Sequence, residues 1–170
     1  MSGRIAVKDS NIFIDMECMG ILDLWFQLGY ETITSNLVVL ELNQGRHGQT
    51  LAYVRSGHIR ELTSPLATLI HYQSQYIGIS AADAAVLHLA VEHKALLLSG
   101  DGKLRQSAEA ESVSCHGSIW VLDQMVKTGI LKGSVAAEKL SGLMLLTGKQ
   151  RRFLPASEAE EYIARWRRLR

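Results

Sequence analysis

Cysteine is scarce in this chain of 170 residues, and its apolar runs are short. The two cysteines, Cys18 and Cys115, are too few and too scattered to form a disulfide framework. No apolar run approaches the roughly 20 residues that a membrane-spanning helix needs. The first residues, MSGRIAVKDS, lack the apolar stretch of a signal peptide. We therefore expect a cytoplasmic protein with no membrane span.

Neither sign of charge dominates the composition. Lys and Arg number 18 and Asp and Glu number 17, which gives a net charge of +1. The chain thus has no overall basic field that would indicate nucleic-acid binding, although local patches can cancel in such a sum. With 47% hydrophobic and 21% charged residues, the composition is that of a soluble globular protein. The length suits one domain with a core of its own.

The residues that often bind zinc or act as sulfur nucleophiles form no pattern. The six histidines include His88 and His93, which are five positions apart and do not share a helix face well. Zinc is therefore not expected. Neither cysteine has neighbours that would make it a nucleophile.

Short apolar segments alternate with segments of helical periodicity along most of the chain. The predicted strands are residues 5–7, 32–34, 59–62, 95–98 and 113–115. The predicted helices are residues 11–28, 35–41, 65–78, 80–94, 104–111, 119–127, 135–146 and 157–169. This alternation predicts an α/β fold with a mostly parallel sheet covered by helices on both faces.

We find no internal repeat and no low-complexity tract. The only candidate hinge is the polar, basic link at residues 147–152. We interpret it as a connection within a single domain that spans residues 1–170. Its core covers about residues 4–131, and a helical extension covers about residues 132–170.

Acidic residues follow or flank the predicted strands. Asp9 follows the first strand, Asp101 follows the strand at 95–98, and Asp83 lies in the first turn of the helix before that strand. Glu41 lies late in the helix after the second strand. Ligands of a parallel sheet bind at the carboxyl ends of its strands, so these acids are candidates for a shared site.

Each acid also has a structural interpretation, and taken singly that interpretation is the stronger one. Asp83 can form a capping box with Ser80, Asp101 precedes a glycine in a turn, and Asp9 can cap a helix. Glu41 can be an exposed residue of an amphipathic helix. Four converging carboxylates would nevertheless repel one another without a counter-ion. An oxygen-rich cluster of this kind suits Mg²⁺ or Mn²⁺.

Four segments containing these acids carry a family resemblance. In order they read VKDSNIFID, LVVLELN, ISAADAAVLHLA and LLLSGDGKLR. Together they resemble the PIN-domain nucleases, most of all the VapC-type proteins of prokaryotic toxin–antitoxin pairs and their uncharacterised relatives. The similarity runs from about residue 5 to residue 131, where GSIWVLDQMVKTGIL resembles the segment that closes the domain. The chain differs from many VapC toxins in the extra helical segment that follows residue 131.

The resemblance implies a three-layer α/β/α fold and a magnesium- or manganese-dependent endoribonuclease that hydrolyses RNA phosphodiester bonds. It implies that one or two metal ions are held by a catalytic set of four acids, Asp9, Glu41, Asp83 and Asp101. Ser10 and Ser99 match hydroxyl positions of the family, and Asn11 completes the D-S-N opening, so these three are auxiliary candidates. The implied partners are RNA, a second copy of the chain in a homodimer, and an antitoxin protein that fills the acidic groove.

Basic residues near the acids are candidates for substrate binding. Lys8, Lys103 and Arg105 adjoin the acids, and Arg46 and His47 follow Glu41. Arg105 fits a solvated helix face equally well. Arg151 and Arg152 are further candidates for phosphate contacts. The last helix, acidic early and basic late, complements the helix dipole and favours a structural role. For four aromatics we favour core or dimer contacts over base stacking, namely Trp25, Phe26, Trp120 and Trp166.

Two other functions stay open at this stage. An aspartate-nucleophile phosphatase or phosphotransferase also places an Asp after the first strand, but it generally has a second acid where this chain has Asn11. A non-catalytic RNA- or partner-binding module with a vestigial site is the other alternative. The presence of all four acids speaks against such decay.

Overall fold

A computed structural model describes residues 4–150, 152 and 154–169. Within them, five parallel strands form one sheet in the order β3-β2-β1-β4-β5. The strands are β1 (Ile5–Lys8), β2 (Glu31–Ser35), β3 (Ile59–Leu62), β4 (Leu96–Leu98) and β5 (Cys115–His116). Helices flank the sheet, which confirms the predicted three-layer α/β/α fold.

The helices that precede β4 are α1 (Ser10–Met19), α2 (Leu22–Trp25), η1 (Phe26–Leu28), α3 (Asn36–Gln44), α4 (Gly48–Arg55), α5 (Leu66–Gln75) and α6 (Ala81–Glu92). Those after β4 are α7 (Gly102–Ala110), α8 (Ser118–Lys127), α9 (Gly133–Met144), η2 (Gly148–Gln150) and α10 (Ala156–Arg167).

Two helical segments differ from the sequence prediction. The helix predicted over residues 11–28 is broken at Gly20, which ends α1 with a left-handed φ of +64° that favours glycine. The chain then re-forms as α2 and η1. Helix α4 lies between the helix predicted over residues 35–41 and the strand predicted over residues 59–62, in a segment where no helix or strand was predicted. Its first residue, Gly48, has no side-chain cap to mark the start.

The order of the strands reverses direction at the centre of the sheet. The chain moves outward from β1 through β2 to β3, and then returns to place β4 on the other side of β1. Such a switch point opens a crevice at the carboxyl ends of the two central strands, here β1 and β4. Asp9 directly follows β1, and its N–H donates to the Leu98 carbonyl at the end of β4 (3.1 Å).

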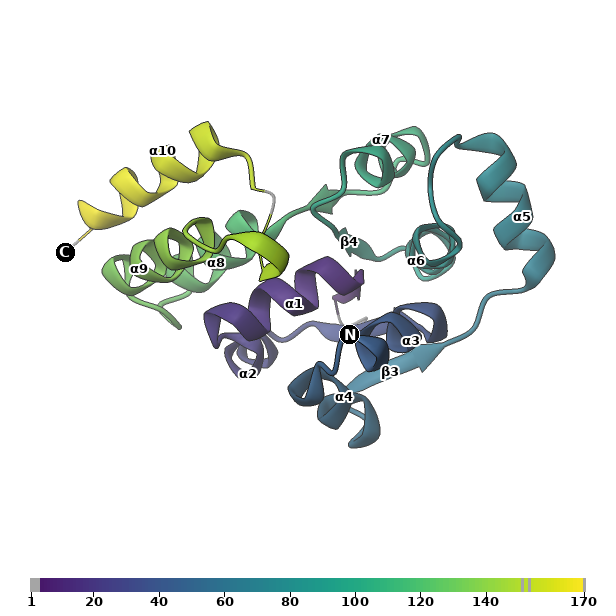
Figure 1. Cartoon of the computed structure of the whole chain (residues 1–170), viewed down its shortest axis with the longest axis horizontal. Coiled ribbons are helices and arrows are strands. Elements are labelled where there is room, and N and C mark those ends of the chain that lie inside the picture. Colours follow the sequence, from purple (N-terminus) through teal and green to yellow (C-terminus); the bar gives the residue numbers. More distant parts are fainter. Residues whose placement is uncertain (1–3, 151, 153, 170) are drawn as a thin grey trace.

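The C-terminal helices pack together at one end of the molecule, away from α5 and α6 (Figure 1). Helix α10 lies across α9 so closely that a Cβ on Gly133 would come within 2.5 Å of the Trp166 carbonyl oxygen. Trp166 is fully buried, and its indole N–H donates to Asp123 of α8 (3.2 Å). These contacts confirm the structural interpretation of the last helix.

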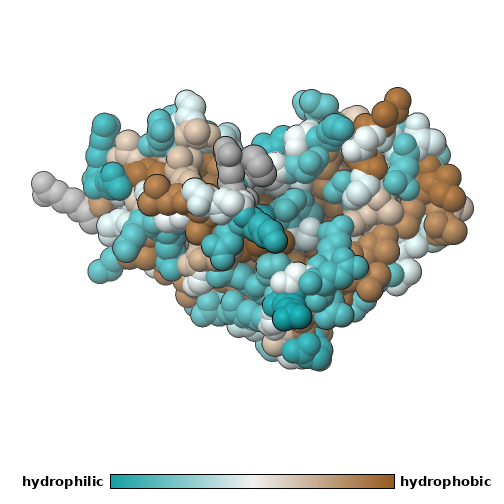
Figure 2. Space-filling model, viewed as in Figure 1, coloured by the Kyte–Doolittle hydropathy of each residue, from teal (hydrophilic) through white to brown (hydrophobic). Residues whose placement is uncertain are grey.

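Three of the six large apolar side chains that are exposed in the described chain lie on and just after α5. They are Leu66, Ile70 and Ile77, of which Ile77 is 92% exposed. Figure 2 shows hydrophobic surface at the end of the molecule where α5 lies. No helix among the described residues is long and apolar enough to cross a membrane.

Candidate active site at the switch point of the sheet

Asp9 lies buried at the mouth of β1, where it caps α1. Its Oδ1 accepts a hydrogen bond from the Ile12 N–H (3.0 Å), and its Oδ2 accepts one from the Ser99 hydroxyl. Only 4% of the residue is exposed. The predicted cap is therefore present, yet the carboxylate also reaches across to the end of the neighbouring strand β4.

Ser99 connects Asp9 to Asp101. The fully buried Ser99 hydroxyl donates to Asp9 and accepts from the backbone N–H of Asp101 (3.0 Å). Asp101 in turn caps α7, because its Oδ1 accepts from the Leu104 N–H (2.8 Å). Two strand ends and two helix starts thus place Asp9 and Asp101 beside one hydroxyl.

Asp83 and Glu41 approach this pair from two other helices. Asp83 forms the predicted capping box of α6, in which its Oδ2 accepts from the Ser80 N–H (2.8 Å). Its negative charge is one of the influences that raise the pKa of Asp9. Glu41, an exposed residue of α3, accepts from the Ser10 hydroxyl beside Asp9 (2.7 Å).

The pKa of Asp9 is raised by its burial and by neighbouring carboxylates at this edge of the sheet. Burial raises the pKa from 3.8 to about 7, against hydrogen bonds from Ser99 and Ile12 that lower it. The charges of Asp83 and Asp15 raise it further. Without a cation, the Asp9 carboxyl therefore carries its charge at a cost.

The chemistry of these donors fits a hard divalent cation. All four candidates are carboxylates, which Mg²⁺ and Mn²⁺ prefer. Three of their oxygens accept no hydrogen bond from a described residue, namely Asp83 Oδ1, Asp101 Oδ2 and Glu41 Oε1. As the side chains are now oriented, no three acidic, histidine or cysteine residues in the described part of the chain are grouped to hold a metal. Rotations of these carboxylates would have to complete such a site.

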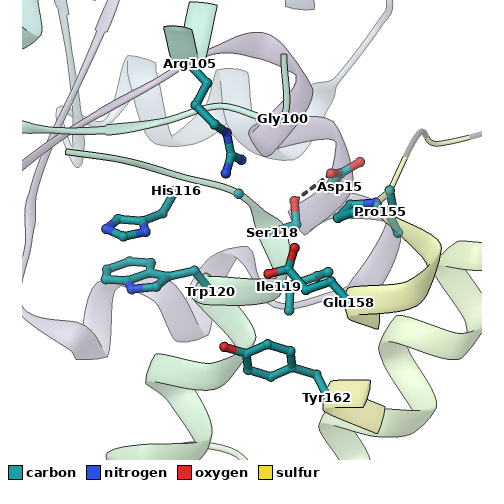
Figure 3. Close-up of a pocket in the computed structure, with 12 residues that line it drawn as sticks. Asp15, Gly100, Arg105, His116, Ser118, Ile119, Trp120, Pro155, Glu158 and Tyr162 are labelled. Atoms are coloured by element: carbon teal, nitrogen blue, oxygen red, sulfur yellow. Dashed lines mark hydrogen bonds between the residues drawn. The ribbon is translucent and has the colours of Figure 1, made fainter. Parts of the chain in front are cut away.

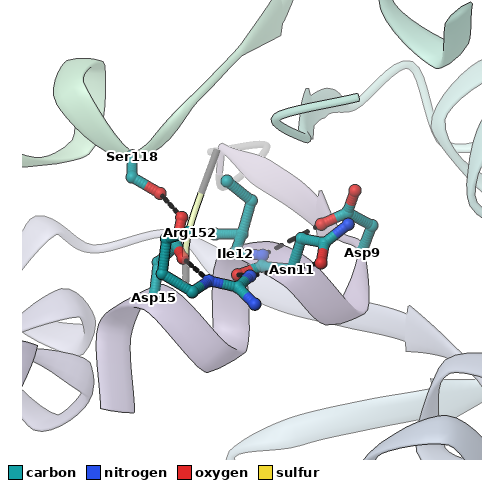
Figure 4. Close-up of polar contacts among 6 residues, drawn as sticks. All are labelled: Asp9, Asn11, Ile12, Asp15, Ser118 and Arg152. Atoms are coloured by element: carbon teal, nitrogen blue, oxygen red, sulfur yellow. Dashed lines mark hydrogen bonds and ion pairs between the residues drawn. The ribbon is translucent and has the colours of Figure 1, made fainter. Parts of the chain in front are cut away.

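A fifth carboxylate, Asp15, lies in the same region and was missed by the sequence analysis. It is buried in α1, accepts a hydrogen bond from the Ser118 hydroxyl (2.6 Å) and pairs with Arg152 (Figure 4). The signal was an acid inside the apolar run IFIDM, which indicates a buried and therefore paired carboxylate. Its main partner, Arg152, is 137 positions away and could not be read from that run.

Arg152 is occupied by protein contacts, which differs from its predicted role as a phosphate contact. Besides Asp15, its guanidinium donates to the Asn11 carbonyl (3.1 Å) and to Asn11 Oδ1 (3.2 Å). Both residues line a cavity of about 350 Å³ together with Asp101. The C-terminal extension therefore forms one wall beside the candidate site. Arg151 lies outside the described residues.

Two of the predicted basic residues make contacts within the protein. Lys8 is fully buried beneath the site, with its Nζ 3.7 Å from the centre of the Trp25 ring and donating to Met16 Sδ (3.2 Å). Burial lowers the pKa of Lys8 well below its ordinary value. His47 pairs with Glu17 (3.0 Å) between α1 and α4.

The other basic candidates are exposed. Lys103 lies on α7 against Gly78, in the loop that leads into α6. Arg105 lies on the same helix and lines a second cavity with Asp15 and Gly100. Arg46 lies in the turn after α3, further along the chain than Glu41. Lys103 and Arg105 thus share a helix with the Asp101 cap, whereas no hydrogen bond or ion pair connects Arg46 to a described acid.

Comparisons with known proteins agree with this architecture. The chain is similar to PAE2754 from Pyrobaculum aerophilum, whose crystal structure superimposes with a TM-score of 0.53 at 12% sequence identity. The match covers 72% of this chain and 90% of that chain, and at this identity it shows the fold alone. Among curated proteins, no sequence is significantly similar. A family model described as PIN domain matches residues 5–167. The chain therefore belongs to the PIN-domain family.

Proposed function

We propose that this protein is a metal-dependent endoribonuclease that hydrolyses RNA phosphodiester bonds. The observation that carries the proposal is the Asp9–Ser99–Asp101 connection at the switch point of the sheet. Asp83 and Glu41 approach the same edge from α6 and α3. Membership of the PIN-domain family, whose members are generally nucleases, supports the same conclusion.

The four acids would hold one or two Mg²⁺ or Mn²⁺ ions. Such an ion supplies Lewis-acid activation of the phosphodiester and of water. The chain's own part is to fix the ligands, since Ser99 orients Asp9 and each aspartate is anchored by a helix start. These helix starts also carry partial positive charge, which favours carboxylates and phosphates.

Exposed cations on α7 would draw the RNA toward this edge. Lys103 and Arg105 follow the Asp101 cap within one helical turn and are exposed. Cations of this kind neutralise phosphates and make binding depend on salt concentration. Buried Lys8 takes no part in this contact.

Cleavage of a labelled RNA by the purified protein tests the proposal. We expect cleavage with Mn²⁺ or Mg²⁺, and none in excess chelator. Asp9→Asn and Asp101→Asn should each lower the rate by about 100-fold or more, the scale of losing a key electrostatic group. Asp23→Asn is the matched control, because Asp23 is an exposed first-turn acid of α2. Cleavage that survives the chelator, or both active-site variants, would refute the proposal.

The finer assignments also belong to this proposal. A cytoplasmic toxin should arrest growth when it is expressed without its antitoxin protein, and Asp9→Ala should relieve the arrest. A homodimer would cover the exposed apolar side chains of α5, so Ile70→Asp should shift a dimer toward monomer in light scattering. Normal growth on expression would refute the toxin assignment, and a monomeric wild type would refute the homodimer. Neither result would contradict the nuclease proposal.

The two alternative functions give different results. A phosphatase or phosphotransferase would form a covalent phosphoenzyme on Asp9. The proposed hydrolysis of RNA involves no such intermediate. A non-catalytic module would bind RNA without metal and show no turnover.

A further inference from the structure

A second cavity of about 310 Å³ opens between α7, the start of α8 and α10 (Figure 3). It lies next to the acidic site, because Asp15 and Gly100 line both this cavity and the one that contains Asp101. Its volume is at the lower end of the range for small-molecule sites, about 300–1,000 Å³. A chain that passes the acids could therefore place one neighbouring group in it.

Aromatic rings line one side of this cavity. His116 and Trp120 are stacked with ring centres 4.6 Å apart and planes 11° from parallel. Tyr162 of α10 lies below them, with its hydroxyl directed toward Trp120 (Figure 3). Burial and the nearby charge of Arg105 lower the pKa of His116, which keeps its ring neutral. Neutral and half-buried aromatic rings are the surfaces on which unstacked bases pack.

Two opposite charges line the same cavity. The Arg105 guanidinium extends into it from α7, and the Glu158 carboxylate extends into it from α10 (Figure 3). No ion pair joins either of them to another residue of the described chain. The cavity thus offers a donor and an acceptor to one planar guest.

Resting on the proposed function, we infer that this cavity is a base subsite that prefers guanine in the nucleotide beside the scissile phosphate. Guanine carries acceptors at O6 and N7, which suit an arginine. It carries donors at N1 and N2, which suit a carboxylate. Adenine lacks the O6 acceptor and the N1 donor, and cytosine and uracil offer a smaller ring for stacking.

The inference gives Trp120 a role that the sequence analysis disfavoured. The interpretation as core was right for Trp25 and Trp166, which are fully buried. Trp120 is only partly buried and presents its ring to the cavity. It is therefore the tryptophan whose fluorescence a bound base would quench.

Fluorescence titration with the four nucleoside monophosphates, without metal, tests the subsite. We expect GMP to quench Trp120 and to bind roughly tenfold more tightly than AMP, CMP or UMP. Glu158→Gln should weaken GMP binding by roughly tenfold and leave AMP binding unchanged. Glu160→Gln is the matched control on the exposed part of the same helix. Circular dichroism melting checks that each variant is folded.

Equal binding of all four nucleotides, no quenching, or GMP binding that survives Glu158→Gln would overturn the inference. The titration needs neither metal nor turnover, so its failure is distinct from that of the proposed function. GMP binding without RNA cleavage would refute the nuclease alone. Metal-dependent cleavage with no preference for a flanking guanosine would refute the subsite alone.

Discussion

At the scale of the residue, Asp9 combines a structural and a chemical role. It caps α1 with one oxygen and meets Ser99 with the other. A carboxyl whose pKa rises on folding, here from 3.8 to about 7, binds more protons in the folded state. The contribution of Asp9 to the stability of the metal-free protein is therefore most favourable below pH 4, and it falls as the pH rises toward 7.

Asp9→Asn should relieve this loss in the metal-free protein, because an amide can keep the cap without the charge. One pKa unit corresponds to about 1.4 kcal/mol, so the variant should be more stable than wild type at pH 8 by at most about 4 kcal/mol. The difference should shrink toward pH 4. Thermal melts from pH 4 to pH 8 in chelator measure it, and a difference independent of pH would contradict the account.

Lys8 is a second residue whose neighbours decide its role. Burial lowers the pKa of Lys8 on folding. At a pH between this lowered pKa and the ordinary value of 10.5, Lys8 is therefore protonated less often in the folded state than in the unfolded state. That cost is present at neutral pH and disappears as the pH rises toward 10.5. Lys8→Met should therefore stabilise the protein at pH 7 by on the order of 1 kcal/mol, since replacing buried charge by apolar volume is often neutral or stabilising.

Denaturant unfolding of this variant at pH 7 and pH 10 provides the test. We expect the advantage of Lys8→Met to be smaller at pH 10. A large loss of stability at pH 7 would instead mean that an ammonium over the Trp25 ring is net stabilising.

At the scale of the element, Asp123 of α8 holds α10 in place by accepting hydrogen bonds from Arg165 and Trp166. Burial alone would raise the pKa of Asp123, but hydrogen bonds from Lys127 and Trp166 and the charge of Arg165 hold the pKa below its ordinary value. A lowered pKa contributes stability above about pH 4, and this stability is lost as the pH falls through the folded-state pKa.

Asp123→Asn should weaken the docking of α10 by about 1–3 kcal/mol, the usual cost of losing hydrogen bonds to a buried charged group. Hydrogen exchange at pH 7 should then speed up in α10 and leave β1 and β4 protected. Glu160→Gln is the control, since Glu160 is an exposed acid of the same helix and makes no ion pair with another described residue. Equal exchange in wild type and Asp123→Asn would show that apolar packing alone holds α10.

Elements with local signals were predictable from the sequence. Ser80 and Asp83 form the predicted capping box of α6, and Ser35, the first residue of the helix predicted over residues 35–41, caps α3, because capping depends on residues within one turn. The strands β1 to β4 were located to within one residue at either end, whereas the two-residue strand β5 (Cys115–His116) overlaps the strand predicted over residues 113–115 only at Cys115. Helix α4 was missed because it starts without a cap, and the break at Gly20 was missed because the apolar pattern continues across it.

The residues of the candidate site were only partly predictable, because only some of them are marked by a local sequence signal. Strand ends and helix starts indicated Asp9, Asp83 and Asp101, since the topology of a parallel sheet brings such positions together. Contacts between distant segments gave no local signal. The Asp15–Arg152 pair and the burial of Lys8 both depend on how elements far apart in the chain pack.

At the scale of the whole molecule, the fold brings three kinds of surface to one edge. The acids lie at the switch point between β1 and β4, exposed cations follow on α7, and the C-terminal helices add the cavity walls. The extension beyond residue 131 therefore contributes to the candidate site as well as to the core, where it buries Trp166.

The central claim is that these acids hold a divalent cation, and a calorimetric Mn²⁺ titration tests it most directly. The account predicts saturable binding to the wild type and to Asp23→Asn. It predicts that binding is lost in Asp101→Asn, which removes one charged ligand while an amide oxygen can still cap α7. Binding of equal strength in Asp101→Asn and wild type would contradict the account, and so would the absence of any binding to the wild type.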